Sequence, residues 1–296
     1  MNIDGKEITI THPEKVLWPD AHITKLDYVR YLIEVSDYIL PYTKDRMLMY
    51  WLYPHGLNRL KVEKRSLPAN APDWIPSTFY KGKERIILND LATLVWLGQY
   101  GALELHVPFD QYTRPNHPTD LVFDLDPSTD DFDLVLKIAL ELKGVLDGMG
   151  LKSIPKTSGK SGLQVYVPVR PEYPFEQTRK VNKFIADYML EKLPKKITLD
   201  RVKKRRGNRL YFDYLQLWKG RTMAVPYTVR ATKHATVSTP VTWQEVQHGF
   251  KPTDFTMDKV IQRVKDYGDL FRPDEMMKKR NNQHLTEIVD FIKSRT

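Results

Sequence analysis

The fold of this chain is decided by a seven-residue segment, Leu121-Val122-Phe123-Asp124-Leu125-Asp126-Pro127. The segment is typical of a short β-strand, in which alternate side chains point to opposite faces. Asp124 and Asp126 therefore share one face, while Leu121, Phe123 and Leu125 point to the other. A strand rise of roughly 3.3 Å per residue separates their Cα atoms by about 6.6 Å, close enough for both to bind divalent ions of the kind that hold phosphates. The alternative is an ordinary half-buried strand that ends in an exposed turn at Asp126-Pro127-Ser128.

A third aspartate lies in a second strand-like segment, Leu210-Tyr211-Phe212-Asp213-Tyr214-Leu215. Alternation places Asp213 on the face opposite to Phe212 and Tyr214. An aspartate in such an apolar strand is unfavourable unless it is paired or bound to a metal. If the two strands are neighbours, Asp213 completes a three-carboxylate site for two divalent ions about 3.5 to 4 Å apart, as used in phosphoryl and nucleotidyl transfer. Sequence spacing alone does not show that the strands are neighbours.

The composition favours a polyanionic partner. The chain has 46 Lys and Arg residues against 37 Asp and Glu residues, a formal net charge of +9, and no cysteine. The basic excess suits nucleic acid, and the lack of cysteine excludes disulfides, Cys-based zinc sites and thiol nucleophiles. Eight basic residues gather before the Asp213 segment, either as a solvated hairpin or as a surface that follows a phosphate backbone. They are Lys195, Lys196, Arg201, Lys203, Lys204, Arg205, Arg206 and Arg209.

Neither the N-terminal sequence nor the distribution of apolar residues suggests a membrane protein. The N-terminus has no signal-peptide pattern, and no apolar run approaches the roughly 20 residues that a membrane-spanning helix needs. We therefore expect a soluble, cytoplasmic protein with no membrane partner.

Hydrophobic periodicity and capping signals predict alternating helices and strands. A capping box at Thr24-Lys25-Leu26-Asp27 begins a helix that runs up to Pro41, and residues 50–74 are expected to be extended or looped. Further helices are predicted over 86–100, entered through Asn89-Asp90, over a segment capped by Asp130 or Asp131 and ending at Gly150, and over 175–193. Strands are predicted over 102–107, 121–126, 163–169 and 210–215. This order predicts an α/β or α+β core. Because no Gly/Ser-rich linker divides the chain, we expect one compact catalytic unit with an N-terminal elaboration.

Three other features could contact phosphate groups. The segment Lys156-Thr157-Ser158-Gly159-Lys160-Ser161-Gly162 could form a backbone N–H cradle or an ordinary turn before a strand, and it lacks the spacing of a P-loop. His106 lies at a strand end, where most histidines are structural. Arg230 could hold a phosphate or form a surface ion pair. No zinc-protease or α/β-hydrolase motif is present.

Taken together, these segments resemble the polymerase domain of bacterial DNA ligase D, a branch of the archaeo-eukaryotic primase superfamily used in non-homologous end joining. Six pieces occur in the order found in that family and cover nearly the whole chain. They are Thr11 to Leu17, Leu103 to Val107, Asp120 to Pro127, Lys156 to Pro168, Tyr211 to Gln216, and Pro226 to Trp243 with Val237-Ser238-Thr239-Pro240. The resemblance implies a primase-polymerase fold, α/β or α+β, with a mixed or antiparallel catalytic sheet flanked by helices. It implies a single domain, 1–296, with an N-terminal elaboration over about 1–100, a catalytic core over about 101–250 and a helical tail over about 251–296.

The resemblance also implies an activity and its site residues. The activity is the addition of nucleotides, usually ribonucleotides, to a 3′-OH at a DNA gap or broken end, by a template-dependent nucleotidyltransferase. By match to the family's motifs, Asp124, Asp126 and Asp213 are expected to hold two Mn²⁺ or Mg²⁺ ions. The residues expected to bind the incoming nucleotide are His106, Ser158, Lys160, Gln216 and Arg230. Lys15 and Lys25 match the residues that grip the 5′-phosphate beyond a gap, although each could equally be a solvated lysine beside a helix start.

Three positions depart from the family pattern. Gln164 stands where a histidine usually follows Gly-Leu. After the Pro-x-Gly at Pro54-His55-Gly56, Leu60-Lys61-Val62 replaces the paired aromatics that stack on the template base, which could shift stacking to Tyr53 or Trp51. Trp51-Leu52 replaces a basic residue just before that Pro-x-Gly. Base stacking contributes about 1 to 3 kcal/mol per base, so template binding is expected to be weaker or relocated.

The family context implies partners and a location. The expected partners are DNA with gaps or double-strand breaks and a 5′-phosphate, nucleoside triphosphates, the end-binding protein Ku and a DNA ligase domain or protein. The expected location is the bacterial cytoplasm, with association with the nucleoid during repair. Two other functions stay open: a non-catalytic module that recognises 5′-phosphorylated ends, and a metal-dependent nuclease that uses the same carboxylates.

Overall fold

The Asp124 segment forms strand β10 (Asp120–Asp126), which is the central strand of a five-stranded sheet in the order β11-β12-β10-β14-β13. The computed structural model describes residues 1–271 and 283–295. β10 pairs antiparallel with both neighbours, whereas β13 and β14 are parallel. The other strands are β11 (Ile154–Thr157), β12 (Leu163–Pro168), β13 (Ile197–Thr198) and β14 (Leu210–Asp213). The expected mixed sheet is confirmed.

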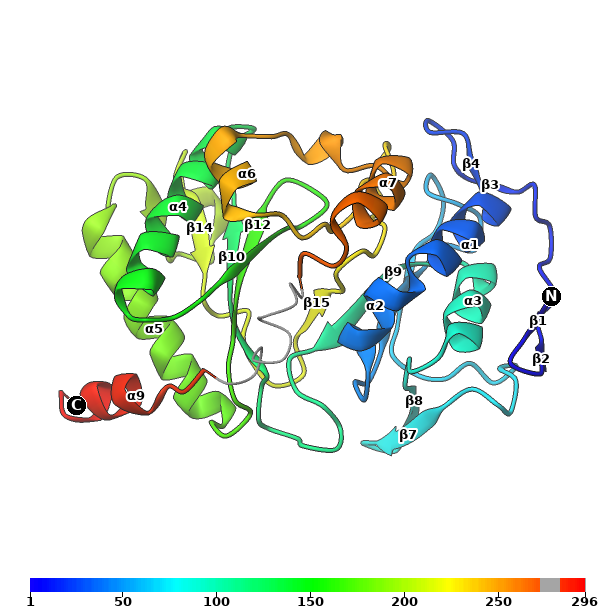
Figure 1. Cartoon of the computed structure of the whole chain (residues 1–296), viewed down its shortest axis with the longest axis horizontal. Helices are drawn as coiled ribbons and strands as arrows, with labels where there is room; N and C mark the ends of the chain where they lie inside the picture. Colours follow the sequence, from blue (N-terminus) through cyan, green and yellow to red (C-terminus); the bar gives the residue numbers. More distant parts are fainter. Residues whose placement is uncertain (272–282, 296) are drawn as a thin grey trace. The chain divides into compact units, whose positions relative to one another are not determined.

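One face of this sheet is apolar. Leu121, Phe123 and Leu125 are completely buried, and the Phe123 ring lies 5.6 Å from that of Phe212 on the neighbouring strand. Helices α4 (Phe132–Gly148) and α5 (Phe175–Lys192) both pack along the sheet (Figure 1). Burial of each such side chain contributes about 1.5 to 3 kcal/mol. The alternation in β10 thus places Leu121, Phe123 and Leu125 on one face and Asp124 and Asp126 on the opposite face, which they share with the buried Val122.

Local signals explain where the helices of this sheet begin and how they attach. Of the two caps that the sequence allows, Asp130 and Asp131, it is Asp131 that caps α4, by accepting a hydrogen bond from the Leu134 N–H at 3.0 Å. In α5, the Asn182 amide donates to the Val122 carbonyl at 2.9 Å, which ties the helix to β10. Helices α6 (Trp243–His248) and α9 (Thr286–Lys293) then pack on α4 and α5, respectively.

A second sheet has four antiparallel strands in the order β15-β9-β5-β6. They are β15 (Thr222–Ala224), β9 (Ala102–Pro108), β5 (Met49–Leu52) and β6 (Val62–Lys64). Helix α3 (Leu91–Tyr100) packs on β9 and on α1 (Lys25–Glu34), and α1 also contacts α2 (Ser36–Thr43) and α7 (Met257–Tyr267). The remaining elements are the pairs β1 (Asn2–Ile3) with β2 (Lys6–Glu7), β3 (Val16–Trp18) with β4 (Ile23–Thr24), β7 (Ser77–Tyr80) with β8 (Lys83–Ile86), and the 3-10 turns η1 (Lys203–Arg205) and η2 (Pro252–Asp254).

The contacts divide the chain into two compact units, each built from three segments. Unit 1 comprises residues 1–113, 222–239 and 253–268 and contains the four-stranded sheet. Unit 2 comprises residues 114–221, 240–252 and 269–296 and contains the five-stranded sheet. The single domain with bounds near 100 and 250 stays a prediction. Residues 272–282 and 296 of its helical tail lie outside the described residues.

Two predicted helices differ from the structure. The helix expected from Thr24 to Pro41 is interrupted at Val35, and Pro41 lies inside α2. Val35 and Ile39 are both completely buried, so the apolar periodicity continues across the break and conceals it. The helix expected from Ile86 begins at Leu91, because Ile86 ends strand β8 and Asp90 caps α3 by accepting from the Thr93 N–H. No helix within the described residues is long and apolar enough to cross a membrane.

Candidate active site

Asp124 and Asp213 are directly opposite each other in the antiparallel pair β10–β14. Residues that face each other in such a pair project from the same side of the sheet. Asp126 lies two residues after Asp124 and therefore shares that side, opposite to the apolar face. The structure thus brings the three predicted carboxylates onto one surface of unit 2, an adjacency that sequence spacing did not show.

Burial and neighbouring carboxylates raise the pKa values of Asp124 and Asp126. Burial raises the pKa of Asp124 well above its ordinary value, and the charges of Asp126 and Asp213 raise it further. Burial also raises the pKa of Asp126, followed by the charge of Asp213, whereas Arg206 and Lys203 act in the opposite direction. Without a cation, this face is therefore electrostatically unfavourable in its ionised form.

The donor chemistry of this face fits a divalent ion. Oδ1 of Asp124 is a buried oxygen with no hydrogen-bond partner among the described residues, although Asp124 as a whole is only half-buried. Carboxylate oxygens are the ligands that Mg²⁺ and Mn²⁺ prefer. Within residues 1–271 and 283–295, no three His, Asp or Glu side chains converge closely enough to form a ready-made metal cluster. The carboxylates share a face without meeting at one point.

The predicted phosphate loop connects β11 to β12 beside these carboxylates. The Ser158 hydroxyl oxygen accepts hydrogen bonds from the N–H groups of Lys160 at 3.1 Å and Gly162 at 3.0 Å. A Cβ atom at Gly162 would lie 2.6 Å from the Leu125 carbonyl oxygen, so glycine is required where the loop crosses the end of β10. Two N–H groups of the expected cradle are thus bonded within the loop. The turn has a defined shape, with the Lys160 side chain exposed.

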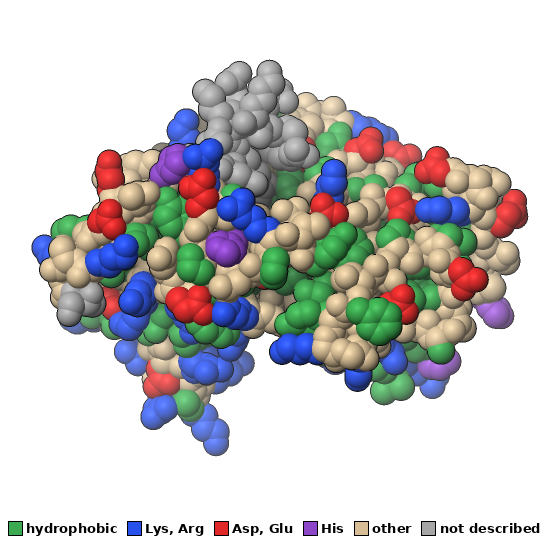
Figure 2. Space-filling model, turned by 90° about the horizontal axis from the view of Figure 1, so that it is seen from below, with side chains coloured by type: hydrophobic (Ala, Val, Ile, Leu, Met, Phe, Trp, Pro, Cys, Tyr) green, Lys and Arg blue, Asp and Glu red, His purple; other side chains and the backbone are tan. Residues whose placement is uncertain are grey.

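Gln216 and the basic segment complete the predicted residues of unit 2. Oε1 of Gln216 accepts from Arg221 at 3.5 Å, just after β14. The Arg206 guanidinium lies 3.8 Å from the centre of the Tyr211 ring, and the side chains of Lys203, Lys204 and Arg205 are exposed. In Figure 2, Lys and Arg side chains gather on a projection at the lower left of the molecule. The electrostatic effect of Lys203 and Arg206 on Asp126 connects this segment with the carboxylate face.

In unit 1, His106 and Arg230 meet at a carboxylate that sequence reasoning missed. Glu104 is 2% exposed, and its Oε2 lies 3.0 Å from Nε of Arg230 and 3.4 Å from Nε2 of His106. Its Oε1 accepts from the Ala231 N–H at 3.0 Å, and it also forms a hydrogen bond with Tyr53, whose pKa is raised by burial and by the Glu104 charge. The signal was present in β9, where Glu104 and His106 are two residues apart and share a face.

Lys15 and Lys25 also come together in unit 1. The Lys25 N–H donates to the Lys15 carbonyl at 2.8 Å, and the Lys25 ammonium donates to the Thr11 carbonyl at 2.6 Å. The Lys15 ammonium donates to the Pro54 carbonyl. Burial lowers the pKa of Lys25, and the charge of Lys15 lowers it further. Two neighbouring ammonium groups of this kind favour an anion between or beside them.

The structure distinguishes Tyr53 from Trp51, the two residues that could replace the missing aromatic pair in stacking on the template base. Tyr53 is 4% exposed and bonded to Glu104, so its ring is not available as a surface platform. Trp51 is half-buried, and the Lys61 ammonium lies 5.2 Å from the centre of its ring. Trp51 is therefore the better candidate for stacking on a base.

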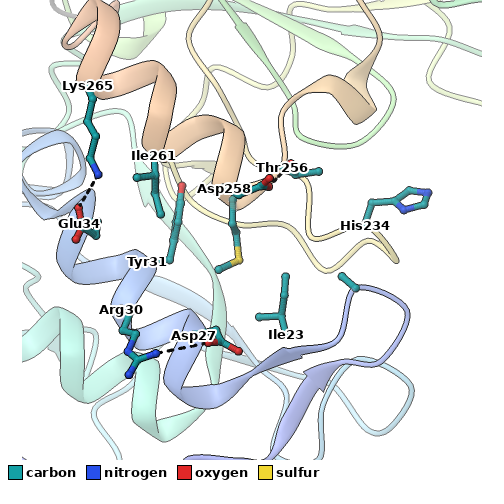
Figure 3. Close-up of a pocket in the computed structure, with 12 residues that line it drawn as sticks. Ile23, Asp27, Arg30, Tyr31, Glu34, His234, Thr256, Asp258, Ile261 and Lys265 are labelled. Carbon is teal, nitrogen blue, oxygen red and sulfur yellow. Dashed lines mark hydrogen bonds and ion pairs between the residues drawn. The ribbon is translucent and has the colours of Figure 1, made fainter.

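A cavity of about 810 Å³ lies within unit 1, between α1 and α7. Several charged residues at its wall pair with each other, Asp27 with Arg30 at 4.0 Å and Glu34 with Lys265 at 3.7 Å (Figure 3). None of the residues predicted to act in catalysis or binding lines it. This cavity of unit 1 is thus separate from the candidate site residues.

Known proteins resemble this chain along most of its length. The family model for the LigD primase-polymerase domain matches residues 24–271. The bifunctional non-homologous end joining protein LigD of Bacillus subtilis is 38% identical over 292 residues, which are 98% of this chain and 47% of that protein. The corresponding multifunctional protein of Mycolicibacterium smegmatis is 27% identical over 275 residues, 90% of this chain and 36% of that protein. The chain thus spans less than half the length of these curated relatives.

A solved structure also matches the fold. The polymerase domain from Mycobacterium tuberculosis ligase D in complex with DNA superposes with a TM-score of 0.83 at 27% identity, and the match covers 90% of this chain and 97% of that chain. The helices and the mixed and antiparallel sheets of both units agree with the fold expected from the sequence. From the family model, the relatives and this structural match together, the chain belongs to the LigD primase-polymerase domain family.

Proposed function

We propose that this chain is a template-dependent nucleotidyltransferase that adds nucleotides, preferably ribonucleotides, to the 3′-OH of DNA at gaps and broken ends. The observation that carries this proposal is the placement of Asp124, Asp126 and Asp213 on one face, with the pKa of Asp124 and Asp126 raised. A protein that only binds a polyanion gains nothing from a cluster of carboxylates, whereas metal-assisted phosphoryl transfer needs one.

Asp124, Asp126 and Asp213 would hold two divalent ions, Mn²⁺ or Mg²⁺. When bound, these ions lower the pKa of the attacking 3′-OH and balance the charge that develops on the transferred phosphoryl group. In the reaction the 3′-oxygen forms a bond to the α-phosphorus, and the bond to the pyrophosphate leaving group breaks. The proton of the 3′-OH is released to water in this step, and no side chain is proposed as its acceptor.

The remaining residues would bind and orient the substrates. Arg230 and His106, held by Glu104, supply positive charge and hydrogen-bond donors for the triphosphate. Ser158, Lys160 and Gln216 are the further nucleotide contacts that we propose. Lys15 and Lys25 would bind a 5′-phosphate on the far side of a gap, which would relieve the repulsion between their two charges. Trp51 is proposed to stack on the template base.

The biological setting is proposed from the relatives. The names of the relatives place them in non-homologous end joining, and the structural relative is in complex with DNA. We propose that this chain acts in the same repair process in the bacterial cytoplasm, at the nucleoid, together with Ku and a DNA ligase domain or protein.

One assay separates this function from its alternatives. The protein is incubated with Mn²⁺, labelled nucleoside triphosphates and a gapped duplex that carries a 5′-phosphate. Extension of the primer supports the polymerase, shortening supports a metal-dependent nuclease, and a mobility shift without either supports a non-catalytic end-binding module. Parallel reactions with ribo- and deoxyribonucleotides test the sugar preference, and a templating base that mismatches the labelled nucleotide tests template dependence.

A further inference from the structure

The chain of unit 1 turns sharply at Val225-Pro226-Tyr227-Thr228, between strand β15 and Arg230. The Thr228 N–H donates to the Val225 carbonyl at 3.1 Å, and the φ angle of Tyr227 is 67°. With proline at its second position and a positive φ at its third, this is a type II turn, whose third residue is normally glycine or asparagine. A tyrosine at that position is strained, and such strain persists only where the surrounding structure holds it.

Buried contacts hold Tyr227 in this conformation. Its N–H donates to the Ser238 carbonyl at 2.7 Å. Its carbonyl accepts a hydrogen bond from the hydroxyl of Tyr31 in helix α1, also at 2.7 Å, and Tyr31 is 1% exposed. The Tyr227 ring lies 5.6 Å from that of Tyr38 in α2. The hydrogen bond to the carbonyl restrains the rotation of the peptide group that leads out of the turn.

The turn leads into a hairpin that carries Arg230. Residues 227–238 form this hairpin, whose two sides are paired through backbone hydrogen bonds. From the hairpin, Nε of Arg230 reaches Oε2 of Glu104 in β9 at 3.0 Å. The Thr228 hydroxyl also attaches the hairpin to β9, because it accepts from the Leu105 N–H at 3.0 Å. The direction in which the chain leaves the turn therefore sets where the Arg230 guanidinium lies.

We propose that Tyr31 is a positioning residue for Arg230, which acts by holding the left-handed turn at Tyr227. A donor that bonds to a strained residue favours the strained conformation over the relaxed ones. Without the Tyr31 hydroxyl, the turn populates other conformations, and the Arg230 guanidinium spends part of its time away from Glu104. The inference rests on the proposed binding of a nucleoside triphosphate by Arg230.

Tyr28 provides a matched comparison on the same helix. It is completely buried, and its hydroxyl donates to the carbonyl of Ala102 at 2.8 Å. Ala102 begins strand β9 and has no positive φ. Tyr28 and Tyr31 thus make the same kind of bond, but only Tyr31 makes it to a strained residue. Loss of either hydroxyl should weaken the fold alike, whereas only the Tyr31 hydroxyl should affect Arg230.

The test compares Tyr31→Phe with Tyr28→Phe in the full chain. Each change removes one hydroxyl and keeps the ring, so both variants should fold and melt at similar temperatures. Tyr31→Phe should raise the KM for the nucleoside triphosphate roughly three- to tenfold, the fold-change that corresponds to one neutral hydrogen bond, and alter kcat less than about twofold. Amide hydrogen exchange over residues 227–238 should also be faster in Tyr31→Phe than in the parent. Tyr28→Phe should change neither the KM nor this exchange.

The two readouts separate the inference from the proposed function. Unchanged exchange over residues 227–238 in Tyr31→Phe, or equal changes in both variants, overturns the inference. Faster exchange with an unchanged KM overturns it as well, because the turn would then hold the hairpin without positioning Arg230 for the nucleotide. If the parent neither binds nor incorporates nucleoside triphosphates, the proposed function is wrong, and the exchange measurement still decides whether Tyr31 holds the turn.

Discussion

The carboxylate face of unit 2 and the Glu104 cluster of unit 1 treat buried charge in opposite ways. On the carboxylate face, burial and neighbouring carboxylates raise the pKa values of Asp124 and Asp126, and one buried oxygen of Asp124 has no partner among the described residues. In the Glu104 cluster, a buried carboxylate is matched by Arg230, His106 and a backbone N–H. The first arrangement becomes favourable when a cation arrives, whereas the second is already complete within the protein. The difference agrees with the proposal that the carboxylate face binds metal, whereas the Glu104 cluster holds its own side chains in place.

The largest effect that this comparison predicts is at Asp124. Asp124→Ala should reduce nucleotide incorporation by at least about 10³-fold, because the metal-borne stabilisation of the transferred phosphoryl group contributes several kcal/mol. DNA binding, which depends on basic residues elsewhere, should stay largely intact in a mobility-shift assay. Full polymerase activity in this variant would show that Asp124 does not hold a catalytic metal.

The next effect tests whether the Glu104 cluster positions its neighbours. Glu104→Gln preserves the size of the side chain but removes the charge that holds Arg230 and His106. We expect a loss of about 10- to 100-fold in kcat/KM, mainly through a higher KM for the nucleoside triphosphate.

The matched control for Glu104→Gln is Glu63→Gln, a carboxylate of the same unit that pairs with Arg65 at an exposed position. Surface pairs contribute little, so this control should leave KM unchanged. Equal KM values in Glu104→Gln and the parent would mean that the cluster only stabilises the fold.

Lys25 offers a smaller effect in unit 1. Lys25→Ala should remove the preference for gaps with a 5′-phosphate, by roughly tenfold, since a hydrogen bond to a charged group contributes about 1.5 kcal/mol. Extension rates on phosphorylated and unphosphorylated gaps measure the preference, and Lys6→Ala, which removes a lysine that pairs with Asp90, is the control. If the parent protein uses both gaps equally, the 5′-phosphate role of Lys15 and Lys25 is wrong.

The smallest effect concerns stability without metal. The pKa of the Asp124 carboxyl is raised above 3.8 in the folded protein. The protonated carboxyl therefore stabilises the folded protein below pH 3.8, and this stabilisation is lost as the pH rises through the raised pKa. Asp124→Asn cannot ionise and should therefore be more stable than the metal-free parent near neutral pH.

Thermal melts with and without Mn²⁺ measure this difference. The ion should stabilise the parent more than Asp124→Asn, and the advantage of the variant should fade in acid. Asp187→Asn, which removes a surface carboxylate paired with Lys183 at 2.6 Å, should not stabilise the protein. An Asp124→Asn variant that is less stable than the metal-free parent would contradict the unfavourable charge on this face.

Local patterns predicted most elements but misplaced some of their limits. The capping box at Thr24 and Asp27, the cap at Asp131 and the alternation of β10 all depend on residues close in the chain, and the structure confirms them. The break at Val35 was missed because buried residues recur at helical spacing on both sides of it. Short-range signals therefore show which segments form elements better than they show where one of them is interrupted.

The candidate site divides in the same way. The sequence by itself determined that Asp124 and Asp126 share a face and that basic residues and a glycine-containing loop accompany them, since strand periodicity and composition are local properties. Only the tertiary structure decided that Asp213 faces Asp124 and that Glu104 holds an arginine 126 residues away. These partners depend on which strands pair and in what register, and pairing is set by the packing of the whole sheet. The sequence of one strand does not specify which strand pairs with it. Which charged side chains face each other in each region is therefore known only from the tertiary structure.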